Sequence, residues 1–168
     1  GMELKSKLDA EVWGVEYDKD AANVARSKLN RVLEGDINSI LGNLPENYFD
    51  TIIFADILEH TPRPDIILSK IRNNIKRSGE LVISLPNVRH WTVIKNLLEG
   101  DWKYEEAGLL DKTHLQFFTK KSIIRMMSNL NFVILEMFAT RFDFEKIPKD
   151  IVSDLSRYGI DTSTLIEE

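Results

Sequence analysis

The sequence contains no cysteine and no long apolar run, and each absence removes a class of protein. A chain without cysteine forms no disulfide bond, has no thiolate-bound zinc and cannot use a cysteine nucleophile; a cytoplasmic location agrees with this composition. Its longest apolar runs, such as residues 51–55, are far shorter than the roughly 20 residues that cross a bilayer. We therefore expect no membrane partner.

An excess of basic residues is also missing. Lysine and arginine number 22 against 27 aspartates and glutamates, which gives a net charge of −5. Because such a chain has no overall positive field to attract a polyanion, we expect no nucleic-acid partner. The 168 residues, of which 43% are hydrophobic, are enough for one domain with a hydrophobic core.

Short apolar runs alternate with helical patterns along most of the chain. Strands are predicted at residues 11–16, 31–34, 49–55, 80–85 and 132–139. Helices are predicted after Asp18 as N-cap, at 65–75 with Ser78 and Gly79 as the stop, at 89–98, and after Thr119. This alternation indicates an α/β fold with a mainly parallel sheet. We expect one domain over residues 1–140 and a polar tail over 141–168 with a short helix at 149–158.

Two carboxylates follow predicted strands, where ligands of parallel sheets bind. Glu16 ends the strand at 11–16, and its carboxylate can accept hydrogen bonds from both hydroxyls of a ribose. Asp36 follows the next strand and can accept a hydrogen bond from an adenine amino group. The alternatives are a solvated strand end for Glu16 and a simple Asx turn for Asp36.

Two histidines are candidate general bases. His60 lies in the segment DILEHTPRP directly after the buried strand at 49–55, and His114 lies three residues after Asp111. Histidine is suited to proton transfer near neutral pH, and a neighbouring aspartate can fix its tautomer. The alternative for His60 is a structural hydrogen bond that fixes the loop. His90, next to Trp91, is interpreted as a packing residue.

The segment between the predicted helices at 89–98 and after Thr119 is rich in aromatic residues. Two explanations remain open: the rings seal the core beneath the segment, or they line a pocket. The residues concerned are Trp102, Tyr104, Phe117 and Phe118.

Five segments, in order EVWGVEYD, EGDI, FDTIIFADILEHTPRP, GELVISLPNVRHW and GLLDKTHLQFFT, resemble the class I methyltransferases that use S-adenosylmethionine. The resemblance covers roughly residues 10–140 and is strongest to the bacterial small-molecule branch. It implies a Rossmann-like sheet with helices on both faces. It also implies methyl transfer to an oxygen or nitrogen of a small-molecule acceptor, by a scheme that requires no metal.

The resemblance also implies roles for particular residues. Glu16 matches the acid that binds the cofactor ribose, and Tyr17 matches the neighbour that packs on adenine. The remaining cofactor positions are the adenine-contacting pair Asp36 and Ile37, and the strand-end residues Ala55, Asp56 and Ile57 beside the methionine moiety. His60 and His114 match positions that face the acceptor pocket and are the expected catalytic residues.

The chain departs from this family at its beginning. The family starts with a strand and a glycine-rich turn of the pattern acid-x-Gly-x-Gly-x-Gly, and this motif is missing. Residues 2–8 resemble the end of the helix that follows that turn. The first strand would lie at the centre of the sheet, between the strands of Glu16 and Phe54. The expected explanations are a truncated start, a homodimer whose second copy completes the sheet, or direct pairing of the two flanking strands.

Two other functions remain as alternatives. The first is a catalytically inactive methyltransferase-like scaffold that serves as a binding or oligomerisation module. The second is a nicotinamide-dependent dehydrogenase, because an acid after the second strand also suits a dinucleotide ribose. The dehydrogenase ranks lower, since the chain has no Gly-x-Gly-x-x-Gly motif and a dehydrogenase function does not explain the segments DILEH and DKTHLQFF.

Overall fold

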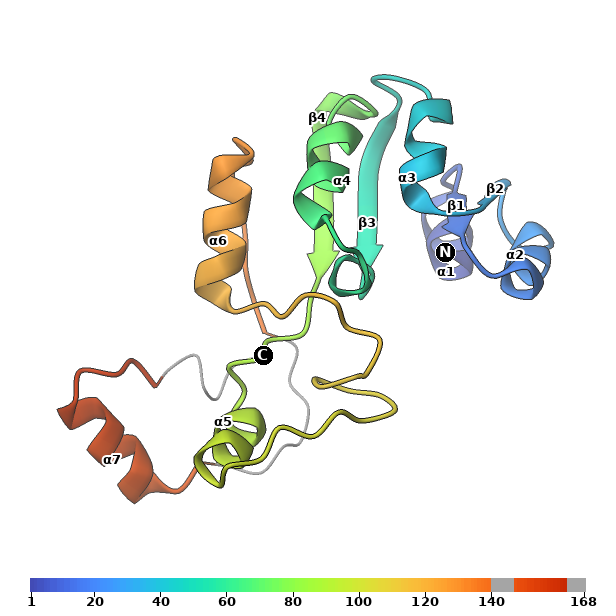
Figure 1. The fold of residues 1–168 in the computed structure, drawn as a ribbon. Helices are drawn as coiled ribbons and strands as arrows, with labels where there is room; N and C mark the ends of the chain where they lie inside the picture. Colours follow the sequence, from blue (N-terminus) through green and yellow to red (C-terminus); the bar gives the residue numbers. More distant parts are fainter. Residues whose placement is uncertain (140–146, 163–168) are drawn as a thin grey trace. The chain divides into compact units, whose positions relative to one another are not determined.

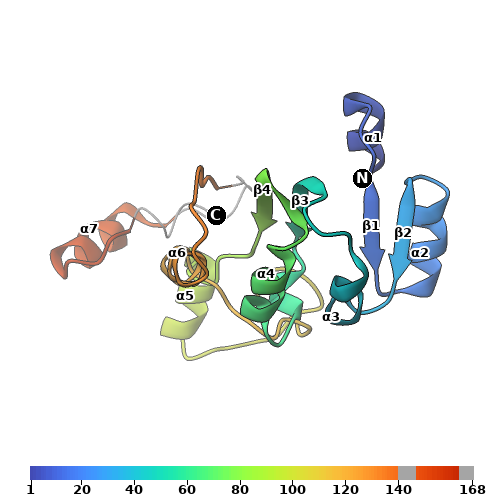
Figure 2. The ribbon, with the colours of Figure 1, turned by 90° about the horizontal axis from the view of Figure 1, so that it is seen from above.

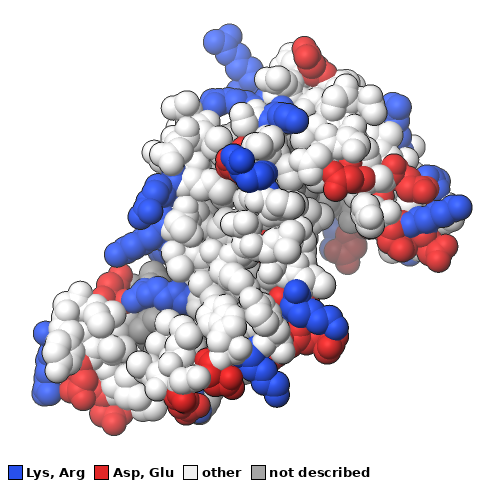
Figure 3. All heavy atoms as spheres, viewed as in Figure 1, with Lys and Arg blue, Asp and Glu red and all other residues white. Residues whose placement is uncertain are grey.

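A computed structural model describes residues 1–139 and 147–162, and the chain divides into two compact units. Unit 1 comprises residues 1–52 and 66–80, and unit 2 comprises residues 53–65 and 81–168. Figure 1 shows the order of the elements along the chain. No helix in the part of the chain that the structure describes is long and apolar enough to cross a membrane. Acidic and basic side chains are interspersed on the face drawn in Figure 3.

A pair of parallel strands with one helix beside it forms the first part of unit 1. In β1 and β2, Trp13 lies opposite Arg31 and Glu16 lies opposite Glu34. Helix α2 contacts both strands, and Figure 2 shows the three elements side by side. The elements up to residue 43 are α1 (Met2–Leu8), β1 (Trp13–Glu16), α2 (Lys19–Arg26), β2 (Arg31–Glu34), α3 (Ile37–Ile40) and the 3-10 helix η1 (Leu41–Asn43).

Aspartate caps start both helices that follow these strands. Asp18 Oδ1 accepts a hydrogen bond from the backbone N–H of Ala21 at 2.8 Å, which confirms Asp18 as the N-cap of α2. Asp36 Oδ1 accepts one from the N–H of Asn38 at 2.7 Å at the start of α3. The strand predicted at 31–34 is confirmed, and the predicted helical character of residues 2–8 is confirmed as α1.

A second pair of strands, β3 (Phe49–Ala55) and β4 (Ile75–Ser84), forms a separate two-stranded sheet. The arrows of β3 and β4 point in the same direction in Figure 1. Helix α4 (Pro64–Ile71) lies between them in sequence, and Leu68 and Ile71 on it are buried. The strand predicted at 49–55 is confirmed, and the mixed α/β character of the fold agrees with the expected class.

The sheet itself differs from the expected single Rossmann-like sheet. Within residues 1–139 and 147–162, β1 pairs with β2 alone and β3 with β4 alone. Of the three explanations considered for the missing first strand, direct pairing of the strands of Glu16 and Phe54 is therefore wrong. In the family pattern, a central strand lies between these two strands and forms hydrogen bonds to both. No described segment of this chain takes the place of that strand.

Ser78 and Gly79 were expected to end the helix predicted at 65–75, and this expectation is wrong. The helix ends at Ile71, and both residues lie inside β4, which begins at Ile75 rather than at Glu80. The physical reason is close packing. A Cβ at Gly79 would lie 2.8 Å from the carbonyl oxygen of Asp50 and 3.0 Å from that of Phe49. Glycine is needed here so that β3 can approach, and it does not break the strand.

The prediction of a strand at 132–139 is also wrong, because these residues adopt no regular strand. Their apolar side chains lie in solvent, with Val133 82% exposed, Leu135 78% and Phe138 77%. An apolar run becomes a strand only when a neighbouring strand accepts its backbone hydrogen bonds, and no described strand pairs with this one.

The helices of unit 2 begin at well-defined caps. Helix α5 (Trp91–Leu98) starts two residues later than predicted, and the buried His90 is its N-cap, accepting from the N–H of Thr92 at 3.3 Å. Helix α6 (Lys120–Asn129) starts at the predicted Thr119, which forms a capping box with Ser122. Helix α7 (Lys149–Arg157) packs through Ile151, Val152 and Leu155 against a small core at Trp91 and Ile147.

We predict that Gly79→Ala lowers the free energy of unfolding by about 1–3 kcal/mol, because the added methyl group forces β3 and β4 apart. Urea denaturation followed by circular dichroism measures the change. Gly42→Ala is the matched control, since a Cβ at Gly42 meets nothing within 4 Å. Equal stability of the two variants would contradict the assigned packing of β3 on β4.

Candidate functional site

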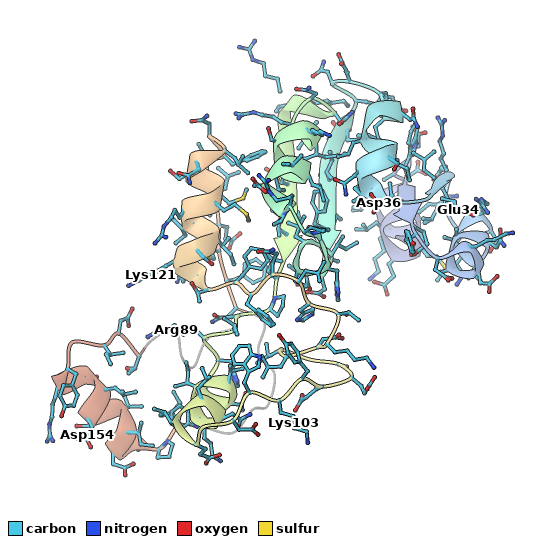
Figure 4. The ribbon with its side chains drawn as sticks, in the orientation of Figure 1. Glu34, Asp36, Arg89, Lys103, Lys121 and Asp154 are labelled. Atoms are coloured by element: carbon cyan, nitrogen blue, oxygen red, sulfur yellow. The ribbon has the colours of Figure 1, made fainter. Side chains whose placement is uncertain are left out.

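In unit 1, the candidate site residues lie at the carboxyl ends of β1 and β2. Glu16 Oε1 accepts a hydrogen bond from the N–H of Asp18 at 3.0 Å, and its carbonyl accepts one from Gly35 at 2.8 Å. Gly35 has a φ of 137°, a conformation that glycine adopts without strain. These bonds hold the end of β1 close to the turn that leads to Asp36, which is labelled in Figure 4.

Two more candidate residues flank these carboxylates. The ring of Tyr17 is 78% exposed, so a planar ligand can stack on it. Ile37, the first residue of α3, is half-buried beside Asp36. The local role that was considered as an alternative for Asp36 is present, because its carboxylate caps α3. One carboxylate oxygen used in a cap leaves the second oxygen free to accept from a ligand.

In unit 2, the end of β3 turns sharply at Asp56. This residue has a φ of 50°, in the left-handed region, and Asp56 Oδ1 accepts a hydrogen bond from the hydroxyl of Ser84 at 2.8 Å. The turn directs the chain out of the sheet into the 3-10 helix η2 (Leu58–His60). Ala55 ends the strand, and Ile57, which is 41% exposed, follows the turn. Ser84, at the end of β4, therefore holds the backbone between β3 and η2 in place.

The aromatic-rich segment is attached to η2 by hydrogen bonds to the Glu59 carbonyl and to the His60 ring. The Glu59 oxygen accepts hydrogen bonds from the N–H groups of Leu115 at 2.7 Å and Gln116 at 3.0 Å. This attachment brings His114 to His60, with 4.8 Å between ring centroids. The two candidate catalytic histidines, 54 positions apart in the sequence, thus form one cluster.

The hydrogen bonds of the two rings define their tautomers. His60 Nδ1 lies 3.3 Å from the carbonyl oxygen of Thr113, and His114 Nδ1 lies 3.2 Å from that of Leu109. A carbonyl oxygen only accepts, so each neutral ring must carry its proton on Nδ1. The Nε2 atom of each ring then keeps its lone pair.

A third contact supports this assignment for His60. The hydroxyl of Thr113 lies 3.0 Å from His60 Nδ1 and donates its hydrogen to Asp111 Oδ1 at 2.6 Å. Because that hydrogen is already used, the Thr113 oxygen accepts from His60. The bonds from Thr113 hold the pKa of Asp111 below its usual value, which keeps the carboxylate charged.

Glu59 is the residue that sequence reasoning missed. Its side chain is 1% exposed, and Oε2 has no hydrogen-bond partner. Burial raises the pKa of Glu59 and the charge of Asp56 adds to this, while His60 and His114 act in the opposite direction. Ligand atoms of Glu59, His60 and His114 all lie within 4.8 Å of one another. The sequence signal was its place beside His60 after a buried strand.

Core packing, one of the two roles considered for the aromatic residues, is confirmed for Phe118, and the pocket-lining role stays a prediction. Phe118 is 6% exposed and belongs to the core. Trp102 contacts Tyr104 and Phe117 with ring centroids 6.4 and 5.4 Å apart, and Phe117 lies 6.2 Å from His114. A partly exposed aromatic cluster therefore adjoins the two histidines in unit 2.

The candidate residues thus divide between the two units. Glu16, Tyr17, Asp36 and Ile37 belong to unit 1, and Ala55, Asp56, Ile57, His60 and His114 belong to unit 2. Within unit 1 the strand ends bring two carboxylates and an exposed ring to one edge of a sheet. Within unit 2, the histidine pair lies at η2, just after the end of β3, and the aromatic cluster contacts this pair through Phe117.

Comparisons with known proteins agree with the fold. A family model described as a methyltransferase domain matches residues 3–137. A SAM-dependent methyltransferase structure from Archaeoglobus fulgidus shares 19% identity, with a TM-score of 0.67 over 99% of this chain and 76% of that chain. A structure from Thermotoga maritima, described as a possible histamine N-methyltransferase, shares 18% identity, with a TM-score of 0.58 over 77% of this chain and 59% of that chain.

Matches also occur among curated proteins. The ABC transporter D family member 1 of Dictyostelium discoideum is 28% identical over 123 residues. The match covers 71% of this chain but only 16% of the length of that relative.

We predict that neutral His60 and His114 both carry their proton on Nδ1. Two-bond ¹H–¹⁵N correlation spectra distinguish the tautomers, because the nitrogen that lacks the proton resonates far downfield. Thr113→Val removes the hydroxyl next to His60 but leaves both carbonyl acceptors, so the His114 pattern should stay unchanged. Spectra with the proton on Nε2 of either ring would contradict the hydrogen-bond assignment.

Proposed function

The chain belongs to the methyltransferase-domain family, and on this basis we propose that it uses S-adenosylmethionine to methylate an oxygen or nitrogen of a small molecule. The observation that carries the proposal is the position of Glu16. Its carboxylate lies at the carboxyl end of a parallel strand, next to the turn that leads to Asp36. Acceptor groups in this arrangement suit a nucleoside, which offers ribose hydroxyls and an adenine amino group.

The residues of unit 1 fit the adenosine part of the cofactor. Among the described residues, the Glu16 carboxylate accepts a hydrogen bond from Asp18 through Oε1, so it retains acceptor capacity for two ribose hydroxyls. The exposed Tyr17 ring offers a stacking surface, and Ile37 offers an apolar contact. The resemblance assigns Ala55, Asp56 and Ile57 of unit 2 to the methionine part.

When bound, the cofactor, held at its adenosine part by Glu16 and Asp36, would supply an electrophilic methyl group on a sulfonium ion. The chain must position the acceptor in line with the methyl group and remove the proton of a hydroxyl acceptor. His60 and His114 suit the second task, because each ring presents an Nε2 lone pair. The rings of Trp102, Tyr104 and Phe117 would help to position the methyl group, since aromatic faces attract a cation such as the sulfonium.

We predict that S-adenosylhomocysteine binds the full chain and that Glu16→Ala weakens the binding about 10- to 100-fold. Hydrogen bonds to a charged group contribute roughly 1.5–3 kcal/mol, which corresponds to this range. Isothermal titration calorimetry measures the affinity. Asp50→Ala is the matched control, because it also removes one carboxylate from unit 1, but that carboxylate lies near the start of β3 and is paired with Lys76.

Two results would contradict the proposal. Equal weakening in the Asp50→Ala control would mean that lost charge, and not the position of Glu16, matters. No binding at about millimolar ligand to a folded chain would favour the alternative function, an inactive methyltransferase-like scaffold.

A further inference from the structure

We propose that Glu59, His60 and His114 form a binding site for a divalent transition-metal ion, with Zn²⁺ as the representative. Each residue offers one ligand atom, and these atoms lie within 4.8 Å of one another. All three residues belong to unit 2, and the bonds from Leu115 and Gln116 to the Glu59 carbonyl connect the two chain segments that carry them.

The two histidines are in the form that binds metals. A metal takes the unprotonated nitrogen of a neutral imidazole, while the other nitrogen donates to a carbonyl or carboxylate that fixes the ring. Here His60 Nδ1 is held by Thr113, and His114 Nδ1 is held by the carbonyl of Leu109. Both Nε2 atoms therefore present lone pairs, and the bond from Thr113 to Asp111 extends this support one residue further.

The carboxylate supplies the second, independent observation. Glu59 is 1% exposed, and its Oε2 has no hydrogen-bond partner. A buried polar atom without a partner is unfavourable, and a carboxylate is especially so unless a positive charge lies beside it. A dication held by the two imidazoles supplies that charge.

The donor set identifies the class of ion. Two imidazole nitrogens and one carboxylate oxygen suit Zn²⁺, Fe²⁺, Co²⁺ or Ni²⁺, whereas Mg²⁺ and Ca²⁺ prefer oxygen ligands only. Ligand atoms around a tetrahedral Zn²⁺ at about 2.0–2.1 Å lie roughly 3.3 Å from one another. Since the present atoms lie within 4.8 Å, small side-chain rotations close the site. His60 is exposed and leaves the ion a route from solvent.

Three protein ligands leave at least one coordination position open. A hydroxyl oxygen of the acceptor would take that position, and the ion would lower the pKa of the hydroxyl in place of a free histidine base. This last step rests on the methyl-transfer function proposed above, whereas binding of the ion does not.

The test uses Co²⁺ and Zn²⁺ with the full chain. Co²⁺ in a site of this kind gives visible absorption, and the chain has no cysteine and only three histidines, so the spectrum has few possible sources. We expect one Co²⁺ per chain, displaced by Zn²⁺. Glu59→Gln and His114→Gln should each weaken Zn²⁺ binding by about 100-fold or more, measured by competition with a chromophoric chelator. His90→Gln, which removes the remaining histidine, is the matched control and should leave the affinity unchanged.

A measurement on the wild-type chain covers the case in which a variant fails to fold. Zn²⁺ should shift the Nε2 resonances of His60 and His114 and leave those of His90 in place. The proposal is wrong if folded protein binds neither ion below about millimolar concentration, if Glu59→Gln binds as tightly as wild type, or if His90 responds like the other two. Because S-adenosylhomocysteine is absent throughout, failure here is distinct from failure of the proposed function.

Discussion

In unit 2, the carbonyl oxygen of Glu59 is the point at which the backbone of the aromatic-rich segment is attached to η2. It accepts hydrogen bonds from Leu115 and Gln116, and these attach an irregular segment to the short helix after β3. An irregular segment has no strand ladder or helical bonds to hold it, so a few such contacts determine its path. The proximity of the two histidines and the place of the aromatic cluster both follow from this attachment.

The candidate site of unit 1 is built differently, from the ordinary ends of parallel strands. Helix caps at Asp18 and Asp36 fix where α2 and α3 begin, and the backbone bond from Gly35 to Glu16 ties the two strand ends together. These are local bonds between residues close in sequence or in adjacent strands. Such bonds form from the sequence pattern itself, which is why strand-end carboxylates are readily found by inspection.

Prediction from sequence worked where local signals decide the structure. The strands at 31–34 and 49–55 and the caps Asp18 and Thr119 agree with the structure. Prediction failed where contacts between residues that are distant in sequence decide the structure. Gly79 lies inside a strand because the backbone of Phe49 and Asp50 comes close, and residues 132–139 have no strand to pair with. Glu59 is a candidate ligand because His114, which is distant from it in the sequence, lies close to it in the structure. A homodimer that completes the sheet stays a prediction.

Glu16 and Asp36, at the strand ends of unit 1, are the residues that we propose to bind the methyl-donor cofactor. The most direct measurement is a ¹H–¹⁵N correlation spectrum of the labelled chain, recorded during titration with S-adenosylhomocysteine. We expect saturable shifts of the backbone amides of Glu16 and Asp36, with small changes in α7. Shifts confined to other regions, or no shifts from a folded chain, would contradict the proposal.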